Sequence, residues 1–191
     1  MIHPQSKNEL DKHLFKGCNI VELGDQFCDW SPEVQGIRTD TYFKEHGIEI
    51  KSVDWHGKNG ALKIDLSEIS TVKLKGDIVT DFGTLEHVKD TYNCLVNCFS
   101  FCKIGGKMIH VNPDKTYVKH GYFYFTEKFW HEYAKLAKLE VISIYTEKPY
   151  DKTNPASEVY AVLKKTDKSR IVSEQEFEGL QKYLGEQEQD V

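Results

Sequence analysis

Short apolar runs that end at a turn alternate with amphipathic segments along most of this chain, and this alternation strongly constrains the fold. We predict strands at residues 19–23, 48–55, 61–66, 77–82 and 107–111. We predict helices at residues 39–45, 88–102 and 126–139. Strands that alternate with helices form a parallel sheet with helices on both faces, and ligands bind at the carboxyl ends of its strands.

The alternation stops in the last third of the chain. Residues 140–146 and 157–165 are two predicted strands with no helix between them, which indicates an antiparallel hairpin. Ser173-Glu174-Gln175-Glu176 is a capping box that opens a final amphipathic helix at about 173–185, and the polar tail after it is expected to fray. The expected fold class is therefore α/β, a doubly wound, mostly parallel, seven-stranded sheet with a C-terminal antiparallel hairpin.

The sequence shows no linker and no repeat, so we expect residues 1–191 to form a single domain with a core at about 17–165. Hydrophobic residues make up 39% of the chain and charged residues 29%, which is typical of a globular protein. No apolar stretch approaches the roughly 18 to 20 residues of a membrane helix, and the first residues lack the apolar core of a signal peptide. We expect a cytoplasmic protein with no membrane partner.

The charge of the chain bears on the class of partner. The net charge is −5, and Arg38 and Arg170 are the only arginines. Proteins that bind nucleic acid usually carry a basic patch, and arginine is the usual ligand of phosphates and guanine edges. Nucleic acid is therefore an unlikely partner and a small molecule is expected, while the sequence gives no indication of oligomeric state.

Three of the five cysteines, Cys94, Cys98 and Cys102, are spaced four residues apart. This spacing places their side chains on one face of a helix. Thiolates bind soft metals, but thiols are also among the most buried side chains in proteins. We predict that these cysteines pack in the core as free thiols, and we predict no metal site.

Acidic side chains lie at the ends of the first four predicted strands. They are Glu22, Asp25, Asp54, Asp65 and Asp81. The carboxyl ends of parallel strands meet at one edge of the sheet, so these groups are expected to converge on one ligand. Carboxylates suit a ligand with hydroxyl or ammonium donors and repel phosphate. In addition, Gln26 follows Gly24 where a dinucleotide-binding turn has its second glycine, which disfavours a nicotinamide cofactor.

Five segments resemble motifs of the class I S-adenosylmethionine-dependent methyltransferases, with the resemblance spanning roughly residues 17–165. They are Ile20-Val21-Glu22-Leu23-Gly24, Asp54-Trp55, Asp65-Leu66, residues 77–88 (DIVTDFGTLEHV) and Cys102-Lys103-Ile104-Gly105-Gly106-Lys107. The Leu85-Glu86-His87 stretch and the glycine pair are the more specific elements. The resemblance implies a Rossmann-like methyltransferase fold and S-adenosylmethionine as cofactor.

The resemblance also implies which residues bind this cofactor. They are Glu22, Leu23, Gly24, Asp25, Gln26, Asp54, Trp55, Asp65, Leu66, Asp81, Phe82 and Gly83. Asp54 is expected to hold the ribose hydroxyls with Trp55 beside the adenine, and Asp65 is expected near the adenine amino group. Glu22 and Gly24 are expected at the methionine end.

Residues after the fourth and fifth strands are expected to face the methyl acceptor. They are Glu86, His87, His120, Tyr122 and Tyr124. His87 is the candidate catalytic base for a hydroxyl acceptor, because imidazole titrates near neutral pH. The alternatives are that His87 caps the following helix or packs beneath the cofactor, and that the aromatic cluster after His120 is ordinary packing.

These residues together predict a methyltransferase that acts on an oxygen or nitrogen of a small-molecule or saccharide acceptor. Two departures from the family pattern affect the expected cofactor binding, and the first of them, together with the short total length, motivates an alternative. Gln26 replaces the second glycine of the first motif, and 30 residues separate Gly24 from Asp54. The alternative is a non-catalytic S-adenosylmethionine-binding or partner subunit that keeps the fold.

Overall fold

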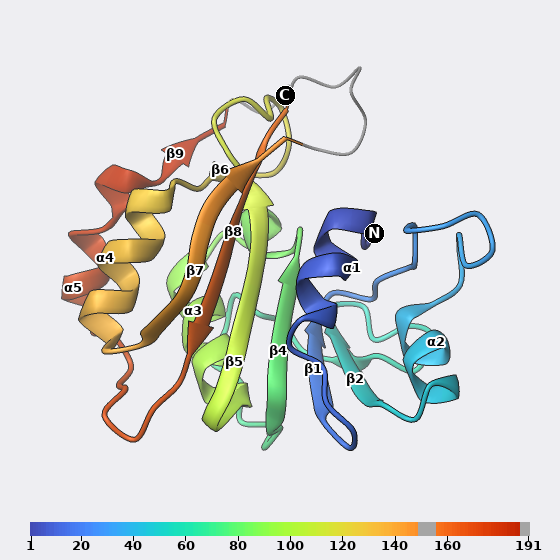
Figure 1. The fold of residues 1–191 in the computed structure, drawn as a ribbon. Helices are drawn as coiled ribbons and strands as arrows, with labels where there is room; N and C mark the ends of the chain where they lie inside the picture. Colours follow the sequence, from blue (N-terminus) through green and yellow to red (C-terminus); the bar gives the residue numbers. More distant parts are fainter. Residues whose placement is uncertain (149–155, 188–191) are drawn as a thin grey trace.

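The computed structural model describes residues 1–148 and 156–187, and its main feature is a seven-stranded sheet of order β3-β2-β1-β4-β5-β8-β7 (Figure 1). The strands are β1 (Asn19–Leu23), β2 (Glu49–Asp54), β3 (Leu62–Lys63), β4 (Gly76–Phe82), β5 (Cys102–Pro113), β7 (Glu140–Glu147) and β8 (Glu158–Lys164). The strand order changes direction between β1 and β4, and a doubly wound sheet opens a ligand crevice at such a point.

The strand pairing agrees with the sequence pattern. Neighbouring strands from β3 to β5 are parallel, and β8 lies antiparallel between β5 and β7. The mostly parallel sheet and the antiparallel C-terminal pair are thus confirmed. The predicted break between β7 and β8, at Pro149 and Pro155, lies outside the described residues.

Helices cover both faces of this sheet. They are α1 (Pro4–Asp11), α2 (Thr39–Glu45), α3 (Thr91–Phe101), α4 (Glu127–Ala137) and α5 (Glu174–Glu178), with two short 3-10 turns, η1 (Leu85–His87) and η2 (Gln181–Tyr183). Helices α1 and α2 lie on one side of the sheet, and α3, α4 and α5 lie on the other (Figure 1). Within the described part of the chain, no helix is long and apolar enough to cross a membrane.

Alternating strand residues supply the two hydrophobic cores. In β1, Ile20 belongs to the cluster beneath α1 and α2, whereas Val21 and Leu23 belong to the cluster beneath α3 and α4. In β4, Ile78 and Val79 divide in the same way. Strands β1 and β4 each bury both of their faces, which explains why they are nearly continuous apolar runs in the sequence.

Three elements of the main sheet and its helices differ from the predictions by three or more residues at one end, two of them for local reasons. The third strand ends at Lys63 because Asp65 accepts hydrogen bonds from the Ser67 amide and hydroxyl, which makes a turn. Helix α3 begins at Thr91 because the Asp90 side chain caps it by accepting from the Asn93 amide. Strand β5 is longer than predicted, running from Cys102 to Pro113.

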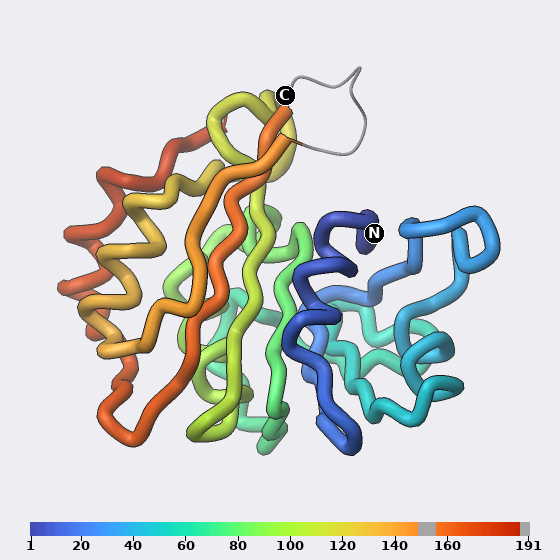
Figure 2. The backbone as a smooth tube through the Cα atoms, in the orientation of Figure 1, coloured from blue at the N-terminus to red at the C-terminus, as the bar shows by residue number. Residues whose placement is uncertain are grey.

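The prediction of one helix over about 173–185 is wrong, and most of the tail that was expected to fray lies outside the described residues. Ser173 and Glu176 do form the predicted capping box, but α5 ends at Glu178. Turn η2 follows, and then β9 (Gly185–Glu186) pairs antiparallel with β6 (Phe123–Tyr124). The C-terminal segment therefore runs beside α4 (Figure 2), with the rings of Phe177 and Phe129 6.3 Å apart.

The N-terminal helix α1 has no counterpart among the sequence predictions. Ile2 and Leu10 bury their side chains in the core beneath α1 and α2, each with 1% of its surface exposed. The Glu9 carboxylate accepts a hydrogen bond from Tyr145 Oη at 3.0 Å, which links α1 to β7. Through these contacts α1 covers part of the sheet near the ends of β4 and β5.

All five cysteines are free and buried, as the spacing predicted for three of them. Burial raises the pKa of the Cys28 and Cys102 thiols to about 12, and the pKa of Cys94 is also raised, chiefly by its hydrogen bond with Cys98. Because the thiolate is the reactive form, the native thiols should resist modification.

We therefore expect a colourimetric thiol reagent at neutral pH to modify none of the five cysteines in the native protein. The same reagent should modify all five in guanidinium chloride, which serves as the control. Rapid modification of any thiol without denaturant would contradict the packing described above.

Candidate functional site

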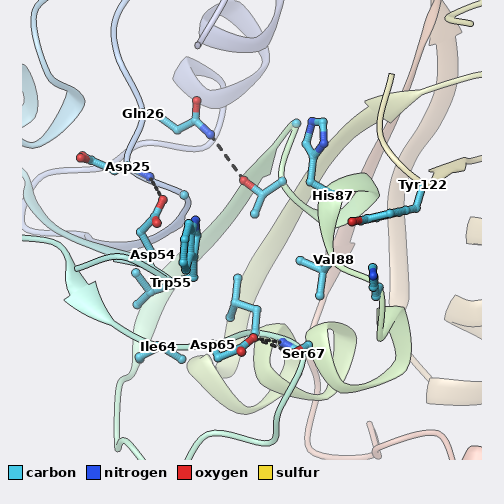
Figure 3. Close-up of a pocket in the computed structure, with 16 residues that line it drawn as sticks. Asp25, Gln26, Asp54, Trp55, Ile64, Asp65, Ser67, His87, Val88 and Tyr122 are labelled. Carbon is cyan, nitrogen blue, oxygen red and sulfur yellow. Dashed lines mark hydrogen bonds between the residues drawn. The ribbon is translucent and has the colours of Figure 1, made fainter. Parts of the chain in front are cut away.

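A cavity of about 560 Å³ opens at the carboxyl ends of β1, β2 and β4 (Figure 3). Its walls are Gly24, Asp25, Gln26, Val53, Asp54, Trp55, Ile64, Asp65, Leu66, Ser67, Gly83, Thr84, His87, Val88, Lys89 and Tyr122. The volume is in the range of small-molecule sites, roughly 300 to 1,000 Å³. The cavity thus lies where the strand order predicted a ligand.

The turn after β1 requires glycine at position 24. Gly24 has a φ of 81°, and a Cβ atom there would lie 2.7 Å from Thr84 Oγ1 and 2.8 Å from Gln26 Nε2. Gln26 Nε2 donates to the Phe82 carbonyl at 3.2 Å and to Thr84 Oγ1 at 3.4 Å. The Gln26 side chain therefore bridges the turns after β1 and β4 at the edge of the cavity (Figure 3).

Asp54 and Asp25 both line the cavity, but their carboxylates differ in availability. Asp54 accepts from the amides of Asp25 and His56, each at 3.1 Å, and 15% of its side chain is exposed. Asp25 is paired with Arg38 and accepts from Asn59 Nδ2 at 2.8 Å. His56 Nε2 also lies 3.2 Å from Asp54 Oδ1, so the acceptor capacity left for a ligand is on Asp54 Oδ2, which accepts from the Asp25 amide. Only 5% of the Asp25 side chain is exposed, so Asp25 contributes chiefly its backbone.

The far end of the cavity combines an apolar wall with a polar turn. Trp55 is 73% exposed, while Ile64 and Leu66 are buried against the core. Asp65 is exposed, and its hydrogen bonds from the Ser67 hydroxyl and amide lower its pKa. This end therefore offers an aromatic ring, aliphatic side chains and a fixed carboxylate, which suits a flat polar heterocycle.

Glu22 and Leu23, predicted as cofactor ligands, do not line the cavity. Leu23 is completely buried in the core. Glu22 is 1% exposed and its Oε2 accepts from Thr39 Oγ1 and Ser52 Oγ, both at 2.7 Å. Burial raises the pKa of Glu22 to about 7. The Glu22 carboxyl therefore joins β1 to α2 and β2 beneath the binding turn.

Asp81 also lies away from the cavity, in contrast to the prediction. It is fully buried, and its Oδ1 accepts from the amides of Thr84 and Leu85. Its Oδ2 accepts from Asn112 Nδ2 at 3.0 Å and lies 3.0 Å from His110 Nδ1. Asp81 thus fixes the position of turn η1, which carries Glu86 and His87.

A second cavity of about 340 Å³ adjoins the first, and Gly83 and His87 line both. Its remaining walls are Met1, His3, Ser6, Phe82, Glu86, Val111, Pro113, Tyr117, His120 and Glu158. Glu86 is 1% exposed at its base, and burial raises the pKa of the Glu158 carboxyl. This polar cavity gathers imidazole and carboxyl groups beside the first cavity.

The predicted site residues therefore separate into three groups. Gly24, Asp25, Gln26, Asp54, Trp55, Asp65, Leu66, Gly83, His87 and Tyr122 line the first cavity. Phe82, Gly83, Glu86, His87 and His120 line the second. Glu22, Leu23, Asp81 and Tyr124 line neither, and the Tyr124 ring instead packs over Gly185, where a Cβ atom would lie 1.8 Å from it.

Sequence reasoning missed several residues of the two cavities. Thr84 follows Gly83 within the recognised segment, so its position offered a usable signal. No local pattern in the sequence pointed to His3, Tyr117 or Glu158. They come from the N-cap of α1, the loop after β5 and the start of β8, which meet only in the folded chain.

No protein-family model matches this sequence, and no curated protein matches it either. Solved structures of methyltransferases resemble its fold at low sequence identity. One is the 1,6-didemethyltoxoflavin-N1-methyltransferase of Burkholderia thailandensis, solved with 1,6-didemethyltoxoflavin and S-adenosylhomocysteine. It is 17% identical with a TM-score of 0.60, over 84% of this chain and 76% of that chain.

Two further structures give the same result. A putative methyltransferase of Bacillus halodurans is 12% identical, with a TM-score of 0.58 over 84% of this chain and 98% of that one. The N-methyltransferase NodS of Bradyrhizobium japonicum, in complex with S-adenosylhomocysteine, is 11% identical. Its TM-score is 0.57, over 85% of this chain and 88% of that one. The chain therefore has the Rossmann-like fold of class I S-adenosylmethionine-dependent methyltransferases.

The raised pKa of Glu22 predicts a pH-dependent stability. The unfolded chain releases this proton near pH 4.5, whereas the folded chain retains it up to about pH 7. The contribution of Glu22 to stability is therefore lost as the pH rises between these values, by about 3 kcal/mol in all.

Glu22→Gln should abolish this loss, so the variant should gain stability relative to the wild type as the pH rises from 4.5 to 7.5. Urea unfolding across this range measures the difference. Glu178→Gln, at an exposed position, is the matched control and should follow the wild type. A constant difference between Glu22→Gln and the wild type at every pH would contradict the assignment.

Proposed function

We propose that this protein is an S-adenosylmethionine-dependent methyltransferase that acts on an oxygen or nitrogen of a small-molecule or saccharide acceptor. One observation carries the proposal. The cavity at the ends of β1, β2 and β4, with the partly exposed Asp54 in its wall, opens beside a second polar cavity, and His87 lies at their junction. A cofactor and an acceptor can therefore be bound side by side.

The first cavity fits the nucleoside part of this cofactor. Asp54 Oδ2 has a free acceptor position for a ribose hydroxyl, and the Asp25 and His56 amides fix the orientation of the carboxylate. Trp55 provides an exposed ring beside the aliphatic side chains of Ile64 and Leu66, which suits adenine. Asp65 supplies an acceptor for the adenine amino group.

The same cavity does not favour a phosphate-bearing nucleotide. A dinucleotide site presents bare backbone amides to pyrophosphate at the turn after the first strand. In this chain the Gln26 side chain lies across that turn, and the Asp25 amide is bound to Asp54. A donor-rich ligand that carries an ammonium group is better accommodated by these acceptors than a phosphate.

The acceptor end is formed by η1 and the loop after β5. The sulfonium of the bound cofactor supplies an electrophilic methyl group, and much of the catalysis of such a transfer comes from positioning and exclusion of water. His87 is half-exposed at the junction of the cavities, where it can contact the acceptor atom. We assign to His87 a role in removing the proton of that atom. Glu86, His120 and Glu158 provide polar contacts for the rest of the acceptor.

Asp54→Ala should weaken S-adenosylhomocysteine binding at least tenfold, about 1.4 kcal/mol, because a charge-assisted hydrogen bond to the ribose is lost. Isothermal titration calorimetry measures the dissociation constant. Glu49→Ala, at the exposed opposite end of β2, is the control and should bind as the wild type does. An unchanged constant in folded Asp54→Ala would place the cofactor elsewhere.

His87→Ala should abolish methyl transfer while leaving S-adenosylhomocysteine affinity within about twofold of the wild type. Transfer of a labelled methyl group to a pool of small-molecule acceptors measures activity, and His131→Ala on the exposed face of α4 is the control. Full activity in His87→Ala would remove this residue from the mechanism.

These two experiments also test the alternative of a non-catalytic subunit. That alternative rests on Gln26, whose side chain bridges the two turns beside the first cavity. Tight product binding by the wild type, with no transfer to any acceptor, would favour it.

A further inference from the structure

We propose that Glu86, His87 and His120 bind a divalent first-row transition-metal ion at the boundary between the two cavities. The three donor atoms lie within 4.8 Å of one another. Glu86 and His87 come from η1, whereas His120 comes from the loop after β5. The metal site itself rests on this geometry alone, and its use in methyl transfer rests on the function proposed above.

The distances fit a small ion with imidazole and carboxylate ligands. Glu86 Oε1 lies 3.5 Å from His120 Nε2 and 3.9 Å from His87 Nε2. Two ligands at bond lengths of about 2.1 Å and a tetrahedral angle are about 3.4 Å apart. Small rotations of the two half-exposed imidazoles therefore bring all three atoms to bonding distance.

The surroundings of the Glu86 carboxyl group are the strongest reason to expect a cation here. The side chain is 1% exposed, yet within the described residues no lysine or arginine forms an ion pair with it. Its Oε2 accepts one hydrogen bond, from Asn112 Nδ2 at 3.1 Å, and both imidazole nitrogens stand beyond ordinary hydrogen-bond length from Oε1. The Met1 ammonium donates to Gln26 Oε1 and acts on Glu86 only through its charge at longer range. Buried carboxylates are normally paired or bound to metal, and a divalent ion between these three groups supplies a direct partner.

The backbone holds His120 against Glu86 independently of any side-chain contact. Gly121 has a φ of 80°, and a Cβ atom there would lie 2.7 Å from the Glu86 carbonyl oxygen. The Tyr122 amide donates to the same oxygen at 2.7 Å, and the His120 amide donates to Gln187 Oε1 at 2.6 Å. The loop after β5 is thereby fixed onto η1, so the ligand positions are set before an ion binds.

A second layer of hydrogen bonds orients the carboxylate ligand. Asn112 Nδ2 bridges Glu86 Oε2 and Asp81 Oδ2, and Asp81 in turn accepts from the amides of Thr84 and Leu85. Such outer hydrogen bonds are typical of metal sites, where they fix the direction of the ligands. In this chain they place Glu86 Oε1 toward the two imidazoles.

The donor set indicates both the class of ion and its use. Two imidazoles and one carboxylate suit Zn²⁺, Co²⁺ and similar ions, and three protein ligands leave coordination positions for another molecule. All three ligands line the second cavity, so those positions face it. An acceptor hydroxyl bound there has a lowered pKa and releases its proton to solvent. With the ion bound, His87 acts on the acceptor through the ion, as one of its ligands, and does not itself accept the proton; the acceptor is an oxygen compound.

Titration of EDTA-treated protein with Co²⁺, followed by visible absorption, tests the site. We expect one Co²⁺ per chain, displaced by Zn²⁺. His120→Ala and Glu86→Gln should each weaken Co²⁺ binding by a factor of at least about 100, and His131→Ala should leave it unchanged. Circular dichroism checks the folding of every variant, and His120 is exposed enough for its replacement to be tolerated.

The inference is overturned if the wild type binds no stoichiometric Co²⁺ or if His120→Ala binds it as the wild type does. Parallel titration with S-adenosylhomocysteine separates this inference from the proposed function. Co²⁺ binding without S-adenosylhomocysteine binding would retain the metal site and reject the methyltransferase. S-adenosylhomocysteine binding without Co²⁺ binding would reject the metal site and retain the proposed function.

Discussion

The buried carboxylate of Asp81 holds together the parts of the chain that form the two cavities. It lies at the end of β4, accepts from two amides of the turn that follows, and contacts His110 and Asn112 of β5. His110 is itself stacked on Trp130 of α4, with ring centroids 4.3 Å apart. A fully buried carboxyl group with four polar neighbours permits few other arrangements, and this fixes the turn that carries Glu86 and His87.

The turns after β1 and β4 are joined in a similar way. Thr84 Oγ1 donates to the Leu23 carbonyl at 2.9 Å, and Gln26 Nε2 donates to the Phe82 carbonyl. Gly24 allows this close approach because it has no side chain between the two turns. The edge of the first cavity is thus a cross-linked pair of strand ends, and a ligand bound there meets groups that are already in position.

The acidic side chains of the site have different roles, and the position of each in the fold decides its role. Glu22 and Asp81 are buried and structural, Asp25 is neutralised by Arg38, and Asp54 and Asp65 remain available to a ligand. Of these side chains, Asp54 and Asp65 are therefore the two that are placed to repel a phosphate. In the second cavity Glu86 is also a buried carboxylate. Its neighbours are two imidazoles, where Glu22 has hydroxyl partners and Asp25 has an arginine, and imidazoles together with a carboxylate are metal ligands.

The sequence by itself determined the order of the seven strands of the main sheet and of α2, α3 and α4 among them, because the two periodicities of burial are local properties of the chain. It also placed Gly24, Asp54, Gly83 and His87 at one edge of the sheet, since parallel strands end together. Tertiary structure alone decided which acidic side chains face the cavity, because that direction depends on turns and hydrogen bonds across strands. It also decided that His120 meets Glu86, since 34 residues separate them and a left-handed Gly121 brings them together. The broken C-terminal helix has the same origin, because the pairing of β9 with β6 is a long-range contact that no local pattern records.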